Sequence, residues 1–250
     1  MTDDDLARSF GAVAGVYESG RPGYPLEVAQ WVLEPIATPL RTARVVDLGA
    51  GTGKFTRVLR ETGADVVAVD PDAAMLAELR VRVPGVPTFQ GTAERMPLPD
   101  ASVDAVVMAQ AWHWVDPPSA AAEAGRVLRP SGALGLVWNI REESVEWVSA
   151  LTTAMGGSHA EEMLAAGEIR AGAPIGPWER RTWRWVRTLT RSALLDMAAS
   201  RSRVIAASVE ERTAILDRVS DLFDAQCRQD GDTEVVDLPY RTEAFRAVRT

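Results

Sequence analysis

One short stretch of the sequence, residues 45–55, combines residue types that suit the binding of a charged ligand. It reads V-V-D-L-G-A-G-T-G-K-F, and its two valines indicate a buried strand that leads into Asp47. Glycines follow at alternate positions, and a helical pattern begins at Phe55. Because glycine has no side chain, a strand, a glycine turn and a helix in this order let a ligand approach bare backbone at the strand's carboxyl end. The stretch therefore predicts a nucleotide-type binding site.

The spacing of the glycines separates the known kinds of nucleotide-binding turn. A phosphate-binding loop requires G-x-x-x-x-G-K-[ST], but position 48 is a leucine and Lys54 is followed by Phe55. A dinucleotide-binding turn requires G-x-G-x-x-G, whereas the spacing here is G-x-G-x-G. The remaining pattern, D-x-G-x-G-x-G after a strand, resembles the turn that class I methyltransferases use for S-adenosylmethionine. A tight glycine turn without a ligand is the alternative.

A second acidic residue, Asp70, favours a cofactor site over a bare turn. It follows the predicted buried strand Val66–Val69 and precedes Pro71 and a helix expected over residues 72–80. It lies close to the offset of about 20 residues beyond a glycine turn at which a carboxylate can accept hydrogen bonds from ribose hydroxyls. An aspartate before a helix can also be a simple cap. At this distance from the glycine turn, ribose binding is the better interpretation.

The composition narrows the class of protein. The 250 residues predict one domain with 46% hydrophobic content, and no apolar run approaches the roughly 18 residues of a membrane span. The acidic N-terminal residues M-T-D-D-D-L-A-R are not typical of a signal or transit peptide, so a cytoplasmic protein is expected. A single cysteine and two histidines argue against a disulfide or a metal site. The net charge of −8 argues against nucleic acid as a partner.

The order of motifs over residues 8–140 resembles the small-molecule branch of class I methyltransferases, namely methyltransferase type 11 and trans-aconitate methyltransferase-like proteins. Phe10, Tyr17, Arg21 and Tyr24 match an N-terminal segment that folds over the cofactor in that branch. The phrase E-A-G-R-V-L-R-P-S-G-A-L at residues 123–134 resembles the helix and turn before the family's fifth strand. Weaker matches follow at S-R-S, residues 200–202, and at L-P-Y-R-T, residues 238–242.

The resemblance implies an α/β, Rossmann-like fold. We expect a seven-stranded, mostly parallel sheet whose last strand is antiparallel, with helices on both faces and a helical cap between strands five and six. The chain is then one methyltransferase domain, residues 1–250. Its expected parts are an N-terminal lid and first helix (1–40), a cofactor-binding core (41–140), a variable cap (141–178) and C-terminal strands and helices that complete the sheet (179–250).

The resemblance also implies a set of cofactor contacts. In the family an aspartate at the position of Thr92 binds the adenine amino group, so here Thr92 or Glu94 would supply that contact, while the backbone N–H of Ala93 needs no side chain. The expected cofactor-binding residues are Tyr17, Arg21, Asp47, Gly49, Ala50, Gly51, Gly53, Asp70, Pro71, Met75, Thr92, Ala93, Glu94, Gln110, Ala111 and Trp112.

A cluster of aromatic residues follows the strand predicted at residues 103–109. It reads Q-A-W-H-W-V-D, residues 110–116, and the rule that open α/β sheets bind ligands beyond the carboxyl ends of their strands places it in the cleft. A tryptophan ring there can stack on adenine or face the sulfonium cation. His113 is the candidate general base. The alternative for His113 is a structural role.

These features together predict a methyltransferase that moves a methyl group from S-adenosyl-L-methionine to a small-molecule acceptor by in-line displacement, leaving S-adenosyl-L-homocysteine. A carboxylate or hydroxyl oxygen is the favoured acceptor, no metal is needed, and the protein is expected to be a monomer or homodimer. Five arginines between residues 180 and 191 can meet an anionic substrate or form a solvated strand face. The alternative functions are a non-catalytic protein that binds the cofactor or its product, and an NAD(P)-dependent oxidoreductase.

Overall fold

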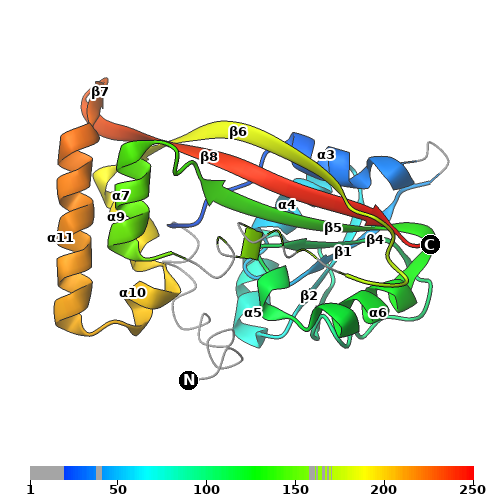
Figure 1. Ribbon diagram of the computed structural model, residues 1–250. Coiled ribbons are helices and arrows are strands. Elements are labelled where there is room, and N and C mark those ends of the chain that lie inside the picture. Colours follow the sequence, from blue (N-terminus) through cyan, green and yellow to red (C-terminus); the bar gives the residue numbers. More distant parts are fainter. Residues whose placement is uncertain are drawn as a thin grey trace.

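The computed structural model describes residues 20–37, 41–157, 161, 163, 164, 167, 169 and 171–250. Within these residues one twisted sheet runs through the molecule, with helices on both faces and a further group of helices at one end (Figure 1). The strand order is β3-β2-β1-β4-β5-β8-β6, and a short strand β7 pairs with β8. None of the described helices is long and apolar enough to cross a membrane.

The first five strands are parallel and the later ones close the sheet in antiparallel pairing with β8. Since β8 runs antiparallel to both β5 and β6, these two strands point the same way. The strands are β1 (Arg44–Leu48), β2 (Asp65–Asp70), β3 (Thr88–Gln90), β4 (Val103–Ala109), β5 (Leu128–Arg141), β6 (Glu179–Thr190), β7 (Arg228–Asp230) and β8 (Thr233–Val248).

The predicted fold class is confirmed, with two differences in the strands. The seven-strand order is present, but β7 adds an eighth strand as a short hairpin partner of β8. The strand predicted over residues 133–138 extends at both ends, because Leu128 pairs with Val103 of β4 and the pairing with β8 continues as far as Arg141. This extension carries two polar residues, Asn139 and Arg141, beyond the apolar part of the strand.

The helices fall into two groups. In the first, α3 and α4 pack on one face of the sheet, while α6 packs on the opposite face. In the second, α7, α9 and α11 share a core with the ends of β6 and β8 (Figure 1). The helices are α3 (Leu26–Leu33), α4 (Lys54–Glu61), α5 (Ala73–Arg82), α6 (Pro117–Val127), α7 (Glu146–Met155), α9 (Arg191–Ala199), α10 (Ser202–Ala206) and α11 (Val209–Gln226), with 3-10 helices η2 (Glu34–Ile36) and η3 (Trp112–Trp114).

The apolar pattern explains why the central strands lie where they do. In β1, Val45 faces the core formed with α3 and α4, and Val46 faces the core formed with α6. A parallel strand that is covered on both faces has a nearly continuous apolar sequence, as V-V-D-L has here. Asp47 is the one charged residue of this buried run, so its position calls for a functional explanation.

The second helical group has its own capping and core. Ser208 and Glu211 form a capping box at the start of α11, in which each side chain accepts a hydrogen bond from the other's backbone N–H. Phe223 of α11 and Leu238 of β8 are fully buried in the core of this group. The second helical group therefore packs on the long antiparallel strands, and it places the short α9–α10 connection near the carboxyl end of β5.

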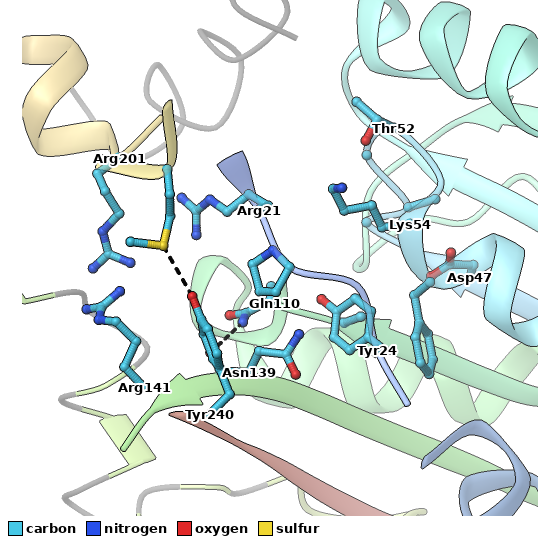
Figure 2. A pocket seen from close by; sticks show the side chains of 17 residues that line it. Arg21, Tyr24, Asp47, Thr52, Lys54, Gln110, Asn139, Arg141, Arg201 and Tyr240 are labelled. Carbon is cyan, nitrogen blue, oxygen red and sulfur yellow. Dashed lines mark hydrogen bonds between the residues drawn. The ribbon is translucent and has the colours of Figure 1, made fainter. Parts of the chain in front are cut away.

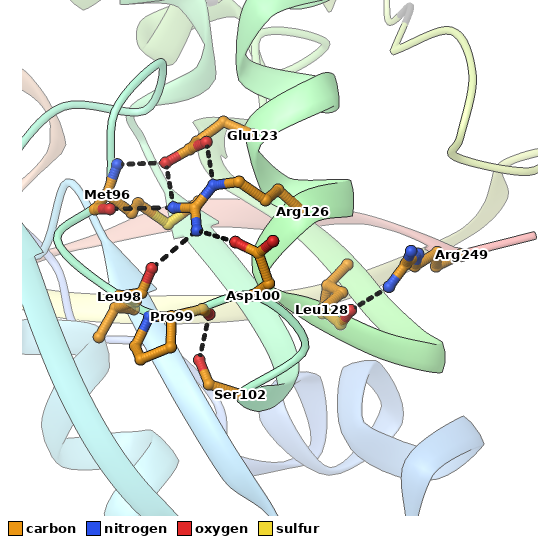
Figure 3. A network of polar contacts seen from close by, with 9 residues as sticks. All are labelled: Met96, Leu98, Pro99, Asp100, Ser102, Glu123, Arg126, Leu128 and Arg249. Carbon is orange, nitrogen blue, oxygen red and sulfur yellow. Dashed lines mark hydrogen bonds and ion pairs between the residues drawn. The ribbon is translucent and has the colours of Figure 1, made fainter.

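Arg126 of α6 fastens the loop between β3 and β4 (Figure 3). Its Nε and Nη2 donate to the carboxylate of Glu123 at 2.7 Å each, and Nη1 donates to Asp100 at 2.6 Å. Two further bonds reach the carbonyl oxygens of Met96 and Leu98. All five N–H donors of the guanidinium are thus used. Thr92 and Glu94 lie near the start of this loop, so this network positions part of the expected adenine site.

Replacing Arg126 with methionine is expected to lower the free energy of unfolding by about 2 kcal/mol or more, because charged Glu123 and two loop carbonyls lose their donors. Arg218→Met is the control, since Arg218 is exposed on α11. Urea-induced unfolding of both variants measures the effect. Equal stabilities of the two variants would contradict the role assigned to Arg126.

Candidate active site

The glycine turn between β1 and α4 adopts the left-handed backbone conformation at each of its glycines. Gly49, Gly51 and Gly53 have φ angles of 70°, 54° and 88°. The N–H groups of Gly49 and Ala50 donate to the carbonyl of Val69 at 2.8 and 3.2 Å, which ties the turn to β2. A Cβ atom on Gly51 would meet nothing within 4 Å. The turn therefore leaves open space next to its backbone.

Asp70, at the end of β2, contacts both the glycine turn and the start of α5, the helix that follows β2. One carboxylate oxygen accepts the N–H of Gly51 and the other accepts the N–H of Asp72, both at 2.8 Å. Burial raises the pKa of Asp70, and these two backbone donors lower it. Each oxygen keeps a further lone pair for a hydroxyl group. Ribose binding by Asp70 stays a prediction.

Asp47 is a buried carboxylate at the end of β1. It is 1% exposed, and its Oδ2 accepts a hydrogen bond from Thr56 Oγ1 at 2.5 Å. Burial, together with the nearby charge of Asp70, raises the pKa of Asp47 to about 7, against the lowering effect of the Thr56 hydrogen bond. A buried acid with this pKa favours a cationic ligand, because a positive charge would stabilise its ionised form.

A pocket with about 710 Å³ of empty space, part of it open to solvent, lies beside this turn. Asp47, Thr52 and Lys54 lie on one side of it, and the guanidinium groups of Arg21 and Arg201 lie on the other (Figure 2). Tyr24 also lines the pocket and packs edge-on against the ring of Phe55, with centroids 4.9 Å apart. The pocket thus joins the predicted cofactor turn to a strongly cationic wall.

The cationic wall contains two buried arginines from distant parts of the chain. Arg141 at the end of β5 is 4% exposed, and Arg201 between α9 and α10 is 8% exposed. Arg141 Nη2 pairs with Glu161 at 2.8 Å and Arg201 Nη2 with the same carboxylate at 3.5 Å. Burial, with the charges of Arg141 and Arg21, lowers the pKa of Arg201 to about 9. Glu161 thus pairs with both buried arginines.

Three polar side chains lie between the two sides of the pocket. Asn139 of β5 is fixed by Thr242 Oγ1, which donates to its Oδ1 at 2.7 Å, and by its own donation to the carbonyl of Gly23 at 2.8 Å. Gln110 has a φ of 57°, unusual for a residue with a side chain, and donates to the carbonyl of Asn139 at 2.9 Å. Tyr240 stacks on the ring of Trp185 at 5.0 Å. These side chains are held rigidly.

Several residues expected at the cofactor site line this pocket: Arg21, Asp47, Gly49, Ala50, Gly51 and Gln110. The other expected residues that the structure describes lie outside its lining. Gly53 caps α4 and Ala111 lies against Gly49. Pro71 and Met75 follow β2, and Ala93 is buried between exposed Thr92 and Glu94. Glu94 accepts the N–H of Asp116 at 3.1 Å. Tyr17 lies outside the described residues. Cofactor binding by these individual side chains stays a prediction.

The aromatic cluster after β4 lies differently from the expectation that it lines the cleft. Trp112 is 2% exposed and belongs to the core under α6. Trp138 Nε1 donates to Nδ1 of His113 at 3.4 Å, so the proton of a neutral His113 ring lies on Nε2. Neither Trp112 nor His113 lines the pocket. General-base catalysis by His113 stays a prediction, and the position of the ring favours the structural alternative.

The structure adds pocket residues that the sequence did not single out, chiefly Thr52, Lys54, Asn139, Arg141 and Met197. Asn139 and Arg141 could have been predicted as pocket residues, because polar residues at the carboxyl end of a parallel strand commonly face a ligand. No sequence pattern predicts Met197 in the pocket, since it reaches the pocket only through the packing of α9.

Comparison with known proteins identifies the chain. Residues 46–136 match the family model described as a methyltransferase domain. Over 245 residues the chain is 46% identical to an uncharacterized methyltransferase of Mycobacterium tuberculosis, covering 97% of this chain and 96% of that protein. The chain is a class I S-adenosylmethionine-dependent methyltransferase.

Further relatives agree with this assignment. The methyltransferase is 31% identical over 250 residues to an uncharacterized methyltransferase-like protein of Schizosaccharomyces pombe, covering 98% of this chain and 97% of that one. The solved structure of a candidate type II methyltransferase from Anaeromyxobacter dehalogenans superposes with a TM-score of 0.65 at 26% identity, over 92% of this chain and 97% of that chain. The sheet and its helices are therefore shared along nearly the whole chain.

The raised pKa of Asp47 predicts that cofactor affinity depends on pH. A cation-bearing cofactor binds the ionised carboxylate, so a protonated Asp47 must first release its proton. We expect the dissociation constant for S-adenosylmethionine to be constant just above pH 7 and to rise up to tenfold per pH unit below about 7. Calorimetric titrations between about pH 5.5 and pH 7.5 measure this. A constant affinity over that range would contradict a contact between Asp47 and the cofactor's cationic groups.

Proposed function

We propose that this methyltransferase transfers the methyl group of S-adenosylmethionine to a carboxylate oxygen of a small-molecule acid. The observation that carries the proposal is the cationic wall of the pocket, where Arg141 and Arg201 are buried beside the expected cofactor turn. Buried guanidinium groups are suited to the paired hydrogen-bond geometry of carboxylates. A molecule that carries a carboxylate is therefore the substrate that the pocket fits best.

The residues of the pocket fit the cofactor. Open space next to Gly51 gives room for close approach to the turn backbone, and the buried carboxylate of Asp47 suits the cationic methionine end. Arg21 is a candidate to bind the methionine carboxylate, and Tyr24 a candidate to cover the pocket. When bound, the cofactor supplies an electrophilic methyl group on a sulfonium. The chain's own task is to hold the acceptor oxygen in line with that methyl group.

A carboxylate acceptor matches the chemistry of the lining. A carboxylate oxygen that attacks the methyl carbon forms the new C–O bond while the C–S bond breaks, and sulfur keeps that electron pair. No proton moves, so no general base is required. A hydroxyl acceptor would have to lose its proton to a base. The described lining includes no histidine, which makes the carboxylate the simpler acceptor.

The test is methyl transfer from radiolabelled S-adenosylmethionine to small acids and to the alcohols with the same carbon skeleton. The proposal predicts methyl esters, which release labelled methanol in base, from acids and not from alcohols. Asp47→Asn serves as the inactive control for background transfer. Transfer to alcohols or amines alone would contradict the proposal, even with the cofactor bound normally.

A further inference from the structure

We propose that the acid carries a second anionic group, which Arg141 and Arg201 bind while a separate carboxylate receives the methyl group. This inference rests on the function proposed above and names the class of acceptor more narrowly. The two arginines are then specificity-determining residues, which anchor the acceptor at a distance from the reacting atoms.

The two arginines form a built anion site. Arg141 Nε donates to Thr152 Oγ1 at 3.0 Å, and Arg201 Nη2 donates to the carbonyl of Gly156 at 3.4 Å, so each side chain is fixed by the protein. Both Nη2 groups reach one carboxylate, that of Glu161. Within the described part of the chain, Nη1 of Arg141 and both Nε and Nη1 of Arg201 make no hydrogen bond. These donors belong to side chains that line the pocket.

The charges of the pocket leave room for a second anion. Arg21, Arg141 and Arg201 lie close enough for their positive charges to oppose one another, and Glu161 supplies one balancing charge. Among the described residues Glu161 is the acid that pairs with both Arg141 and Arg201, so an acceptor anion can supply the pair with a second negative charge.

The group bound by the arginines is unlike the group that accepts the methyl. An accepting carboxylate loses its negative charge as the ester forms, so strong hydrogen bonds from two guanidinium groups would stabilise the reactant more than the transition state. An anion that keeps its charge throughout the reaction avoids this loss. Arg141 and Arg201 therefore suit binding of a spectator group.

The arrangement of the pocket agrees with an acceptor that has two ends. Figure 2 shows Arg141 and Arg201 on the side away from Asp47, Thr52 and Lys54, with Asn139 and Tyr240 between. An acid anchored at the arginines extends past these two residues toward the cofactor side. Its second carboxylate then lies where the amide of Asn139 and the backbone near Gln110 can orient it.

The second anion can be a carboxylate or a phosphate, since both present oxygens to paired guanidinium groups. The experiment therefore compares three matched sets: short linear dicarboxylic acids, the monoamides of the same acids, and the corresponding phosphono-carboxylic acids. Methyl-ester formation gives kcat and KM, and calorimetry on the S-adenosylhomocysteine complex gives binding of the same acids without turnover.

Dianionic acids are expected to have a kcat/KM roughly 100-fold above that of the matched monoamides. Arg201→Met should remove this preference by raising the KM of the dianions far more than the KM of the monoamides, and binding of S-adenosylhomocysteine checks that the fold is intact. Glu161→Gln should act in the opposite direction and lower the KM of dianions severalfold, because it removes the internal carboxylate that competes for the same donors. Damage to the fold would lower binding in both variants.

Equal use of dianions and monoamides would overturn this inference alone and leave the proposed function intact. An Arg201→Met variant that loses activity equally on the dianions and the monoamides would also overturn this inference alone, since the arginine would then have a general structural role. If the cofactor binds and no acid of any set is methylated, the proposed function fails, and this inference fails with it.

Discussion

Asp47→Asn is expected to raise the melting temperature of the cofactor-free protein by a few degrees and to weaken S-adenosylmethionine binding by about 100-fold or more. In the folded protein the pKa of Asp47 is raised from 3.8 to about 7, so the fold disfavours the ionised form. Its unfavourable contribution therefore grows as pH rises from 3.8 toward 7 and is constant above that. Asparagine keeps an oxygen for Thr56 and removes the charge that the cofactor needs.

Thermal unfolding at several pH values, together with calorimetry, measures both effects. The matched control is Asp65→Asn, because Asp65 is an exposed aspartate at the start of β2. The gain in stability of Asp47→Asn should shrink as pH falls below about 7. A variant that binds the cofactor normally would contradict the role of Asp47 as the partner of a cationic group.

Gly49→Ala is expected to destabilise the fold by about 2–4 kcal/mol and to abolish measurable cofactor binding. Its φ of 70° lies in the left-handed region, and its Cβ would lie 2.6 Å from the Cβ of Ala111. The turn must shift to relieve this contact, and the backbone that lines the pocket shifts with it. Urea unfolding and calorimetry measure the two losses.

Two further glycines separate backbone strain from loss of the site. Gly231, in the β7–β8 hairpin, has a φ of 60° and no atom within 4 Å of an added Cβ, so Gly231→Ala measures strain alone. Gly51→Ala has the same open surroundings but lies in the pocket lining. It should match Gly231→Ala in stability and lose cofactor affinity. Normal affinity in Gly51→Ala would show that no ligand approaches the turn closely.

The sequence predicted the cofactor half of the fold well because its signals are local. Parallel strands covered on both faces have continuous apolar runs, so β1, β2 and β4 were recognised, and β4 has the predicted bounds. The left-handed glycines follow from the spacing in one turn. The end of β5 was missed because its last residues, which include Arg141, are polar, and the strand continues only through pairing with β8.

The acceptor half could not be predicted in the same way. Arg201 approaches Arg141 only because α7, α9 and α11 pack on the ends of β6 and β8, and no local pattern records this contact. Three of the five arginines between residues 180 and 191 pair with acids on other elements, namely Arg180, Arg184 and Arg191. Arg180 pairs with Glu243 at 2.9 Å. Most of this run is thus a solvated strand face, the alternative that the sequence left open.

The central claim is that the glycine-turn pocket binds S-adenosylmethionine for methyl transfer. Calorimetric titration of the purified protein with S-adenosylmethionine, S-adenosylhomocysteine and NAD⁺ tests it most directly. We expect one site with dissociation constants on the order of micromolar for the first two ligands, no binding of NAD⁺, and loss of the binding heat of both ligands in Gly51→Ala. Absence of binding by the wild-type protein, or binding of NAD⁺ in place of the methyl donor, would contradict the account.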